Sequence, residues 1–301
     1  MPRPKLVAIL EATFAVTVWG ASFVATKVAV QEVSPVTVVW LRFTIGVVIL
    51  GLATLIRKQF ALPERSEVCY FALLGFLGIT FHQWLQSTGL VTAQATTTAW
   101  IVATMPIFIA ILGWLVLAEK LSWRQGMGIT VAVLGALLVL SKGDLTALAG
   151  GRFGTRGDFL VMLSAPNWAV FTILSRRGLR RYPATRMMFF VMVFGWLFSS
   201  VLFITRGGLD EWPAFSADGW LSVGFLGVFC SGLAYIFWYD ALKALPAAQA
   251  GAFLYLEPFV TVIVAALVLG EPLLGVTLLG GAAILLGVWV VNRFAITGKG
   301  K

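Results

Sequence analysis

Cysteine and histidine are scarce in this chain, and their scarcity excludes several kinds of site. The 301 residues contain two cysteines, Cys69 and Cys230, and one histidine, His82. Two cysteines in or beside apolar stretches do not form the disulfide framework of a small secreted domain, and with one histidine their spacing fits no zinc motif. The sequence therefore predicts no metal site and no bound cofactor.

Enzyme signatures are missing as well. The sequence contains no His-Glu-x-x-His motif, no Gly-x-Ser-x-Gly motif and no ATPase signature. The glycines Gly150, Gly151 and Gly154 lie in a predicted loop and not between a strand and a helix, so they do not form a phosphate-binding loop. We expect a protein that is not an enzyme and that draws any energy it needs from a gradient.

Charge is sparse, and long apolar stretches take its place. Charged residues make up 12% of the chain and hydrophobic residues 59%, whereas about 25% of a soluble domain is charged. Ten apolar stretches are each long enough to cross a bilayer core of about 30 Å as a helix. They are predicted at residues 6–30, 34–56, 67–88, 93–117, 121–141, 157–179, 184–205, 217–243, 247–269 and 273–295.

These stretches do not fit a transmembrane barrel, whose strands are about 10 residues long and alternate in polarity. The sequence therefore predicts an all-α polytopic membrane protein with ten transmembrane helices in a lipid bilayer. The first apolar run is too long for the core of a cleavable signal peptide, so it is interpreted as the first span.

The net charge of +9 does not point to nucleic acid, because the basic residues sit at the predicted helix ends. Cytoplasmic loops carry an excess of Lys and Arg. Of the 22 Lys and Arg residues, Arg42 lies inside a span and sixteen fall on the side that holds the N-terminus; the opposite side holds Lys27, Lys142, Arg152, Arg156 and Arg206. This distribution predicts no nucleic-acid partner and places both termini in the cytoplasm.

The chain repeats itself at half its length. Gly75-Phe76-Leu77-Gly78 recurs as Gly224-Phe225-Leu226-Gly227, 149 residues later, and Trp19 and Trp168 share that offset. An offset of 152 relates Pro106 to Pro258, Glu119 to Glu271, Gly128 to Gly280, and Gly135 to Gly287. We therefore predict two five-helix halves, residues 1–145 and 155–301.

An odd number of spans in each half forces the second half to insert upside down relative to the first. Inverted repeats of this kind are typical of secondary transporters, which hold their substrate near the midplane between the repeats. A duplicated structural scaffold is the other interpretation.

Three motifs resemble a known family. Trp19-Gly20-Ala21-Ser22-Phe23 resembles the WG-x-S-F start of the drug/metabolite transporter superfamily, EamA-like branch, and Leu41-Arg42-Phe43 is similar to its LRF motif. The Pro106…Glu119 and Pro258…Glu271 pairs resemble the ends of its two repeats. The second half departs from the pattern, with Asn167-Trp168-Ala169 in place of Trp-Gly and no clear Leu-Arg-Phe, so the two walls of a shared cavity are expected to differ.

The resemblance covers nearly the whole chain. It implies a ten-helix exporter of small metabolites, often amino acids, in a bacterial inner membrane. Within the family the chain is most similar to the aromatic amino-acid exporters.

Ionisable residues inside spans are costly in lipid, so each is a candidate for function. Glu257 lies in the ninth span just before Pro258, which frees a carbonyl one turn earlier; a carboxylate there suits a substrate ammonium group or a proton, or it locks helix packing. His82 shares a helix face with Gln86 and is expected to line the pathway, either as a proton-coupling group or as a neutral side chain bonded to a neighbouring helix. Arg42 is expected to be structural and paired with a carboxylate or helix-end carbonyls.

Aromatic residues are abundant, with 12 Trp, 23 Phe and 5 Tyr. Because aromatic faces suit apolar side chains and cations, the deep aromatics are expected to line a midplane cavity, although each taken singly fits simple packing. The predicted cavity set is Trp19, Ser22, His82, Gln86, Trp100, Asn167, Trp168, Tyr255 and Glu257.

Two matched prolines and two matched glutamates complete the candidates. Pro106 and Pro258 are predicted hinges, because prolines inside helices kink them; static kinks are the alternative. Glu119 and Glu271 stand at helix ends, where an acid favours the positive end of a helix dipole, so they are interpreted as caps and not as transport groups.

Together these features predict a secondary transporter that exports small metabolites, above all aromatic or hydrophobic amino acids, by alternating access. A multidrug or nucleoside exporter of the same superfamily is the alternative, and a non-transporting receptor or scaffold is a third interpretation. The expected partners are a small-molecule substrate and the lipid bilayer, with coupling to protons left open. A single chain with two complete halves is expected to function as a monomer.

Overall fold

The computed structural model describes residues 4–117, 121–144, 146, 154–245 and 247–294; Glu119, Gly150 and Gly151 lie outside this set. Among the described residues every regular element is helical, and ten helical stretches are long and apolar enough to cross a membrane. The predicted fold class and number of spans are confirmed. The predicted ends of the spans agree with the observed ones to within two residues.

Five spans make up the first half. They are α1 (Lys5–Ala29); α2 (Pro35–Ile56); a third span of α3 (Arg65–Gly75), the π-helical segment η1 (Phe76–Phe81) and α4 (His82–Leu90); a fourth span of α5 (Ala95–Val102) and α6 (Met105–Leu117); and α7 (Trp123–Ser141).

The second half follows the same plan. Its spans are α9 (Arg156–Arg181); α10 (Ala184–Thr205), followed by the short 3-10 helix η2 (Gly208–Ala214); an eighth span of α11 (Ala217–Phe225), the π-helical segment η3 (Leu226–Leu233) and α12 (Ala234–Ala244); a ninth span of α13 (Ala247–Phe253), η4 (Leu254–Leu256) and α14 (Glu257–Leu269); and α15 (Gly275–Arg293).

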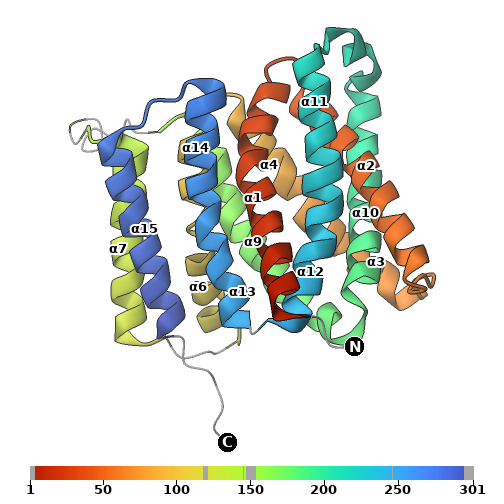
Figure 1. Ribbon diagram of the computed structural model, residues 1–301, viewed down its shortest axis with the longest axis horizontal. Coiled ribbons are helices and arrows are strands. Elements are labelled where there is room, and N and C mark those ends of the chain that lie inside the picture. The colour runs from red at the N-terminus through yellow and green to blue at the C-terminus, as the bar shows by residue number, and fades with distance from the viewer. Residues whose placement is uncertain (1–3, 118–120, 145, 147–153, 246, 295–301) are drawn as a thin grey trace, which may run out of the picture.

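The spans stand side by side as one upright bundle, and α15 ends at the same edge of it at which α1 begins (Figure 1). We call this edge the terminal side and the opposite edge the far side. Helix α1 begins on the terminal side and, after five crossings, α9 begins on the far side. Equivalent helices of the two halves therefore run in opposite directions.

Local sequence signals explain several helix starts. The Ser34 hydroxyl accepts a hydrogen bond from the Thr37 amide ahead of Pro35 at the first position of α2. Thr155 and Asp158 cap the start of α9 reciprocally, with each side chain bonding the other's backbone amide. These caps satisfy amide groups that have no partner within the helix.

The helices α7 and α15, the last of each half, pack against each other through paired glycines. A Cβ atom on Gly128 would lie 2.7 Å from the carbonyl oxygen of Gly287, and one on Gly135 would lie 2.6 Å from that of Gly280. Gly128 thus faces the repeat mate of Gly135, and Gly135 faces the repeat mate of Gly128. Two equivalent helices that pack antiparallel produce this exchange. Helix association in lipid depends on such close approach, because lipid offers helices no hydrophobic drive to associate.

We predict that Gly128→Ala destabilises the protein whereas Gly126→Ala on the same helix does not. The added methyl group at Gly128 meets the backbone of α15, and overpacking of this kind costs about 2 kcal/mol. A Cβ atom on Gly126 meets nothing within 4 Å, so that variant keeps or slightly raises stability. Unfolding of the purified protein by denaturing detergent measures both free energies, and equal values would contradict the close contact.

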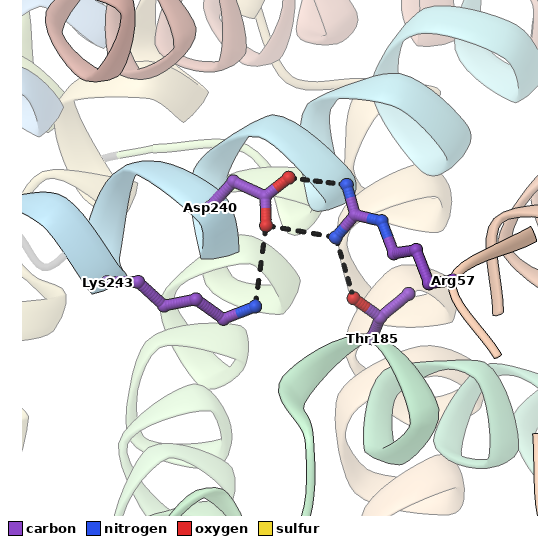
Figure 2. A network of polar contacts seen from close by, with 4 residues as sticks. All are labelled: Arg57, Thr185, Asp240 and Lys243. Carbon is purple, nitrogen blue, oxygen red and sulfur yellow. Dashed lines mark hydrogen bonds and ion pairs between the residues drawn. The ribbon is translucent and has the colours of Figure 1, made fainter. Parts of the chain in front are cut away.

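A polar network joins three helices at the terminal side (Figure 2). Arg57, the residue after α2, directs both terminal nitrogens at the Asp240 carboxylate in α12, with an Nη1–Oδ1 distance of 2.9 Å. The same Nη1 donates to the Thr185 hydroxyl in α10 at 3.2 Å. Lys243 adds a weaker contact to Asp240 at 3.4 Å. The Asp240 side chain is only 4% exposed, so its charge depends on these cations.

Arg57→Met is expected to lower the free energy of unfolding by about 2 kcal/mol, because it removes the two-pronged arginine partner of a buried carboxylate. Lys58→Met removes the same charge one residue away, at an exposed side chain, and serves as the control. The same detergent unfolding assay applies. Equal stability of the two variants would show that the Arg57–Asp240 pair is energetically silent.

Candidate functional site

A cavity of about 420 Å³ lies in the middle of the bundle, walled by residues from eight of the ten spans; α7 and α10 contribute none. Its lining at the far side, Thr26, Ser87 and Leu90, is buried. Its lining at the terminal side includes Leu179 and Asn292, which are exposed. The cavity is therefore open toward the terminal side and closed toward the far side.

Two charged side chains make the far-side closure. Lys27, near the end of α1, donates to the carbonyls of Leu90 and Ala93 in the connection between α4 and α5. Glu271, which follows α14, accepts hydrogen bonds from the amides of Ala95 and Thr96 at 2.7 and 3.0 Å. Glu271 is thus a helix cap, as predicted, but it caps α5 in the first half and not its own neighbour α15.

Most of the predicted cavity residues lie in the cavity wall. The lining includes Trp19, Ser22, His82, Gln86, Trp168, Tyr255 and Glu257, together with Pro106 and Pro258. Trp100 and Asn167 do not line it. Trp100 is 1% exposed and packs on Gly281 of α15, where a Cβ atom would lie 2.5 Å from the indole. The Asn167 amide is engaged elsewhere, because it donates to the Leu77 carbonyl at 2.8 Å.

The third span of each half contains a π-helical segment, or widened turn, at the repeated Gly-Phe-Leu-Gly motif. Such segments leave carbonyl groups outside the regular α-helical ladder and occur often at functional sites. The Trp19 indole in α1 donates to the Cys230 carbonyl in η3 at 3.1 Å, and Asn167 in α9 donates to Leu77 in η1. The first helix of each half thus supplies a donor to the widened turn of the other half. No sequence motif indicated these widened turns.

The aromatic side chains form two clusters on the cavity wall. The ring of Trp19 lies 5.7 Å from that of Tyr235 and 5.5 Å from that of Trp238. The ring of Trp168 lies 4.6 Å from the His82 imidazole and 4.8 Å from Phe171. Each half therefore contributes one tryptophan with aromatic neighbours, and the cavity presents ring faces and edges to whatever enters it.

His82 and Glu257 are the titratable groups predicted for the site. The Nδ1 atom of His82 is sealed from solvent and has no hydrogen-bond partner of good geometry, while the imidazole interacts with the Ser164 backbone. The Glu257 carboxylate has no hydrogen bond or ion pair to any described side chain, and its own carbonyl accepts from the Thr261 hydroxyl at 3.0 Å. The Glu257 carboxylate is therefore available to a molecule in the cavity, whereas the His82 imidazole is engaged with the Ser164 backbone and the Trp168 ring.

Arg42 was expected to be structural, yet it lines the cavity. It is 5% exposed, and its Nε and Nη1 atoms donate to Ser231 at 3.0 Å and Gln83 at 3.1 Å. Neither partner is the predicted carboxylate or helix-end carbonyl. Sequence analysis placed Arg42 in a span but had no signal for its partners, which lie 189 and 41 residues away.

The fourth and ninth spans are interrupted at equivalent positions. α5 ends at Val102 and α6 begins at Met105, just before Pro106; α13 ends at Phe253 and α14 begins at Glu257, just before Pro258. Discontinuous helices at matching places of two repeats are a mark of transporter binding sites, because they bring unpaired backbone groups to the cavity. Within the residues described, no cluster of three or more metal-ligating side chains occurs.

Comparison with known proteins agrees with this geometry. The sequence model of the EamA-like transporter family matches residues 6–141 and again residues 155–293. An uncharacterized transporter of Archaeoglobus fulgidus is 25% identical over 275 residues, which cover 91% of this chain and 93% of the relative. A probable terminal-alkyne amino-acid exporter of Streptantibioticus cattleyicolor is 27% identical, with 95% and 93% covered.

A solved crystal structure has the same fold, with a TM-score of 0.66 at 22% identity over 98% of each chain. Ten membrane-crossing helices, the interrupted helices and the two family matches lead to one assignment. This multi-pass membrane protein belongs to the EamA-like transporter family and transports small molecules.

Proposed function

We propose that the protein exports small metabolites across a bacterial inner membrane, above all amino acids with aromatic or hydrophobic side chains. The observation that carries the proposal is the cavity, which is closed on the far side and combines two aromatic clusters with Arg42, His82 and Glu257. Apolar faces bind an apolar side chain, and charged groups bind a polar head. The relative from Streptantibioticus cattleyicolor, a probable terminal-alkyne amino-acid exporter, supports an amino-acid cargo.

Alternating access supplies the mechanism of this proposal. The two family matches support repeats with bounds of 1–145 and 155–301, and the excess of Lys and Arg supports cytoplasmic termini. The terminal side is then the cytoplasmic side, and the cavity is open to the cytoplasm. Bending at Pro106 and Pro258, where the helices are already interrupted, would close that mouth as the far side opens.

Counterflow in proteoliposomes tests the transport function. We expect unlabelled phenylalanine inside the vesicles to accelerate uptake of labelled phenylalanine through the wild-type protein. Trp168→Ala removes part of the aromatic wall and should lower uptake about tenfold, whereas Trp220→Ala, at an exposed site in the first turn of α11, should not. Nucleosides and cationic drugs are included as competitors.

Each other outcome excludes one part of the proposal. Competition by nucleosides or drugs without competition by amino acids would favour the multidrug or nucleoside exporter. Binding without flux across a sealed vesicle would indicate a receptor. A covalently changed product would indicate an enzyme.

The far-side closure gives a separate prediction about the conformational equilibrium. Glu271→Gln weakens the hydrogen bonding to the amides of Ala95 and Thr96, because a glutamine side chain keeps one acceptor oxygen and turns an NH2 donor toward the other backbone N–H. We expect a membrane-impermeant maleimide added to the far side to label a cysteine at Ser87 several-fold faster in this variant, in a background that lacks Cys69 and Cys230.

Glu211→Gln is the matched control for this measurement. Glu211 also accepts a backbone hydrogen bond on the far side, from the Ser34 amide. Neither Glu211 nor Ser34 lines the cavity. Unchanged labelling in Glu271→Gln, or equal acceleration in both variants, would show that Glu271 does not hold the far side closed.

A further inference from the structure

The guanidinium group of Arg42 keeps hydrogen-bonding capacity that its neighbours do not use. Its Nε atom donates to the Ser231 hydroxyl and its Nη1 atom to the Gln83 side-chain oxygen. Both acceptors are neutral. Nη2 has no hydrogen bond to any described residue and is not among the polar atoms sealed from solvent. A face of this buried cation is therefore turned to the cavity without a counter-charge.

Two partly buried arginine head groups have a different environment. Arg57 is paired with Asp240, and Arg186 is paired with Glu67 at 3.2 Å. Arg42 is the most buried of the three and has no carboxylate partner among the residues that the structure describes. Since a buried charge is costly unless it is paired, an anion from outside the chain is the missing partner.

The surroundings of Arg42 indicate what kind of anion fits. The widened turn η3 holds Arg42 through Ser231 and holds the Trp19 indole through the adjacent carbonyl of Cys230. One turn thus fixes a guanidinium group and an aromatic ring side by side on the cavity wall. An anionic head attached to an apolar body satisfies both.

We infer that Arg42 binds the carboxylate group of the transported molecule. The planar fork of arginine matches the two oxygens of a carboxylate, and the hydrogen bonds to Ser231 and Gln83 hold the fork in place before the ligand arrives. Glu257 does not neutralise Arg42, because no hydrogen bond or ion pair joins them. The inference rests on the proposed function in taking this cavity as the transport site.

Matched ligands that differ only in the head group test the inference. The probes are phenylalanine, its amide, 3-phenylpropionate and phenethylamine, with binding to purified protein in nanodiscs measured by calorimetry. In the wild type, the two carboxylates should bind at least about tenfold more tightly than the two probes without one, the size of a charge-assisted hydrogen bond. Arg42→Gln should erase this preference, and Arg42→Lys should keep it at lower affinity.

Arg206→Gln is the control, since Arg206 is an exposed residue at the end of α10 and outside the cavity; it should leave all four affinities unchanged. Equal wild-type binding of phenylalanine and its amide would overturn the inference, as would a carboxylate preference that survives in Arg42→Gln or a wild type that binds none of the probes. If Arg42→Gln does not fold, the wild-type preference and Arg42→Lys decide the question.

Failure of this inference is distinguishable from failure of the proposed function. Flux of amino acids with no dependence on the carboxylate would leave the exporter standing and remove the role of Arg42. Carboxylate binding that depends on Arg42, with no flux, would keep the role of Arg42 and remove the exporter.

Discussion

Inside a bilayer, every backbone amide and carbonyl must find its hydrogen-bond partner within the protein, and this requirement governs both the scaffold and the site. It makes each crossing helical. Where the helix is irregular, at η1, at η3 and before Pro106 and Pro258, the irregular backbone lies beside the cavity or takes a donor from a neighbouring span. Trp19 and Asn167 are those donors for η3 and η1. The binding wall is thus built where the regular ladder is broken.

The scaffold was predictable from the sequence because its signals are local. The length of an apolar run fixes a span, and the ten spans were placed to within two residues. The repeat of Gly-Phe-Leu-Gly and of the paired glycines indicated two related halves, and α7 and α15 bring Gly128 to Gly287 and Gly135 to Gly280. A single glycine does not identify a contact. The regular spacing of glycines along a helix, however, indicates which face can approach another helix closely.

The candidate site was predictable only in part, because it depends on the rotation of each helix about its own axis. A span that is apolar on every side does not reveal which face meets the cavity. Trp100 was deep enough in the membrane but points at Gly281, and Asn167 donates to a carbonyl of the π-helical segment η1. Arg42 bonds Ser231 and Glu271 bonds Ala95, each more than a hundred residues away along the chain, and no spacing rule reaches that far.

The two halves have diverged in sequence, so the cavity wall is asymmetric although the scaffold around it is nearly symmetric. Trp19 and Gly75 both have their mates 149 residues later, so the equivalent of Arg42 is Val191, which is fully buried. By the same offset, the partner of Arg42, Ser231, is the equivalent of His82. One interface between the halves therefore carries a guanidinium group and a hydroxyl, and the other carries a valine and an imidazole whose ring is tilted against that of Trp168. Two matching cations would repel each other and accept a ligand in either direction, whereas a single one leaves one favourable orientation for a molecule with an anionic head. In the proposed mechanism the symmetric bundle would provide the two states of access, and the single arginine would set how the cargo lies between them.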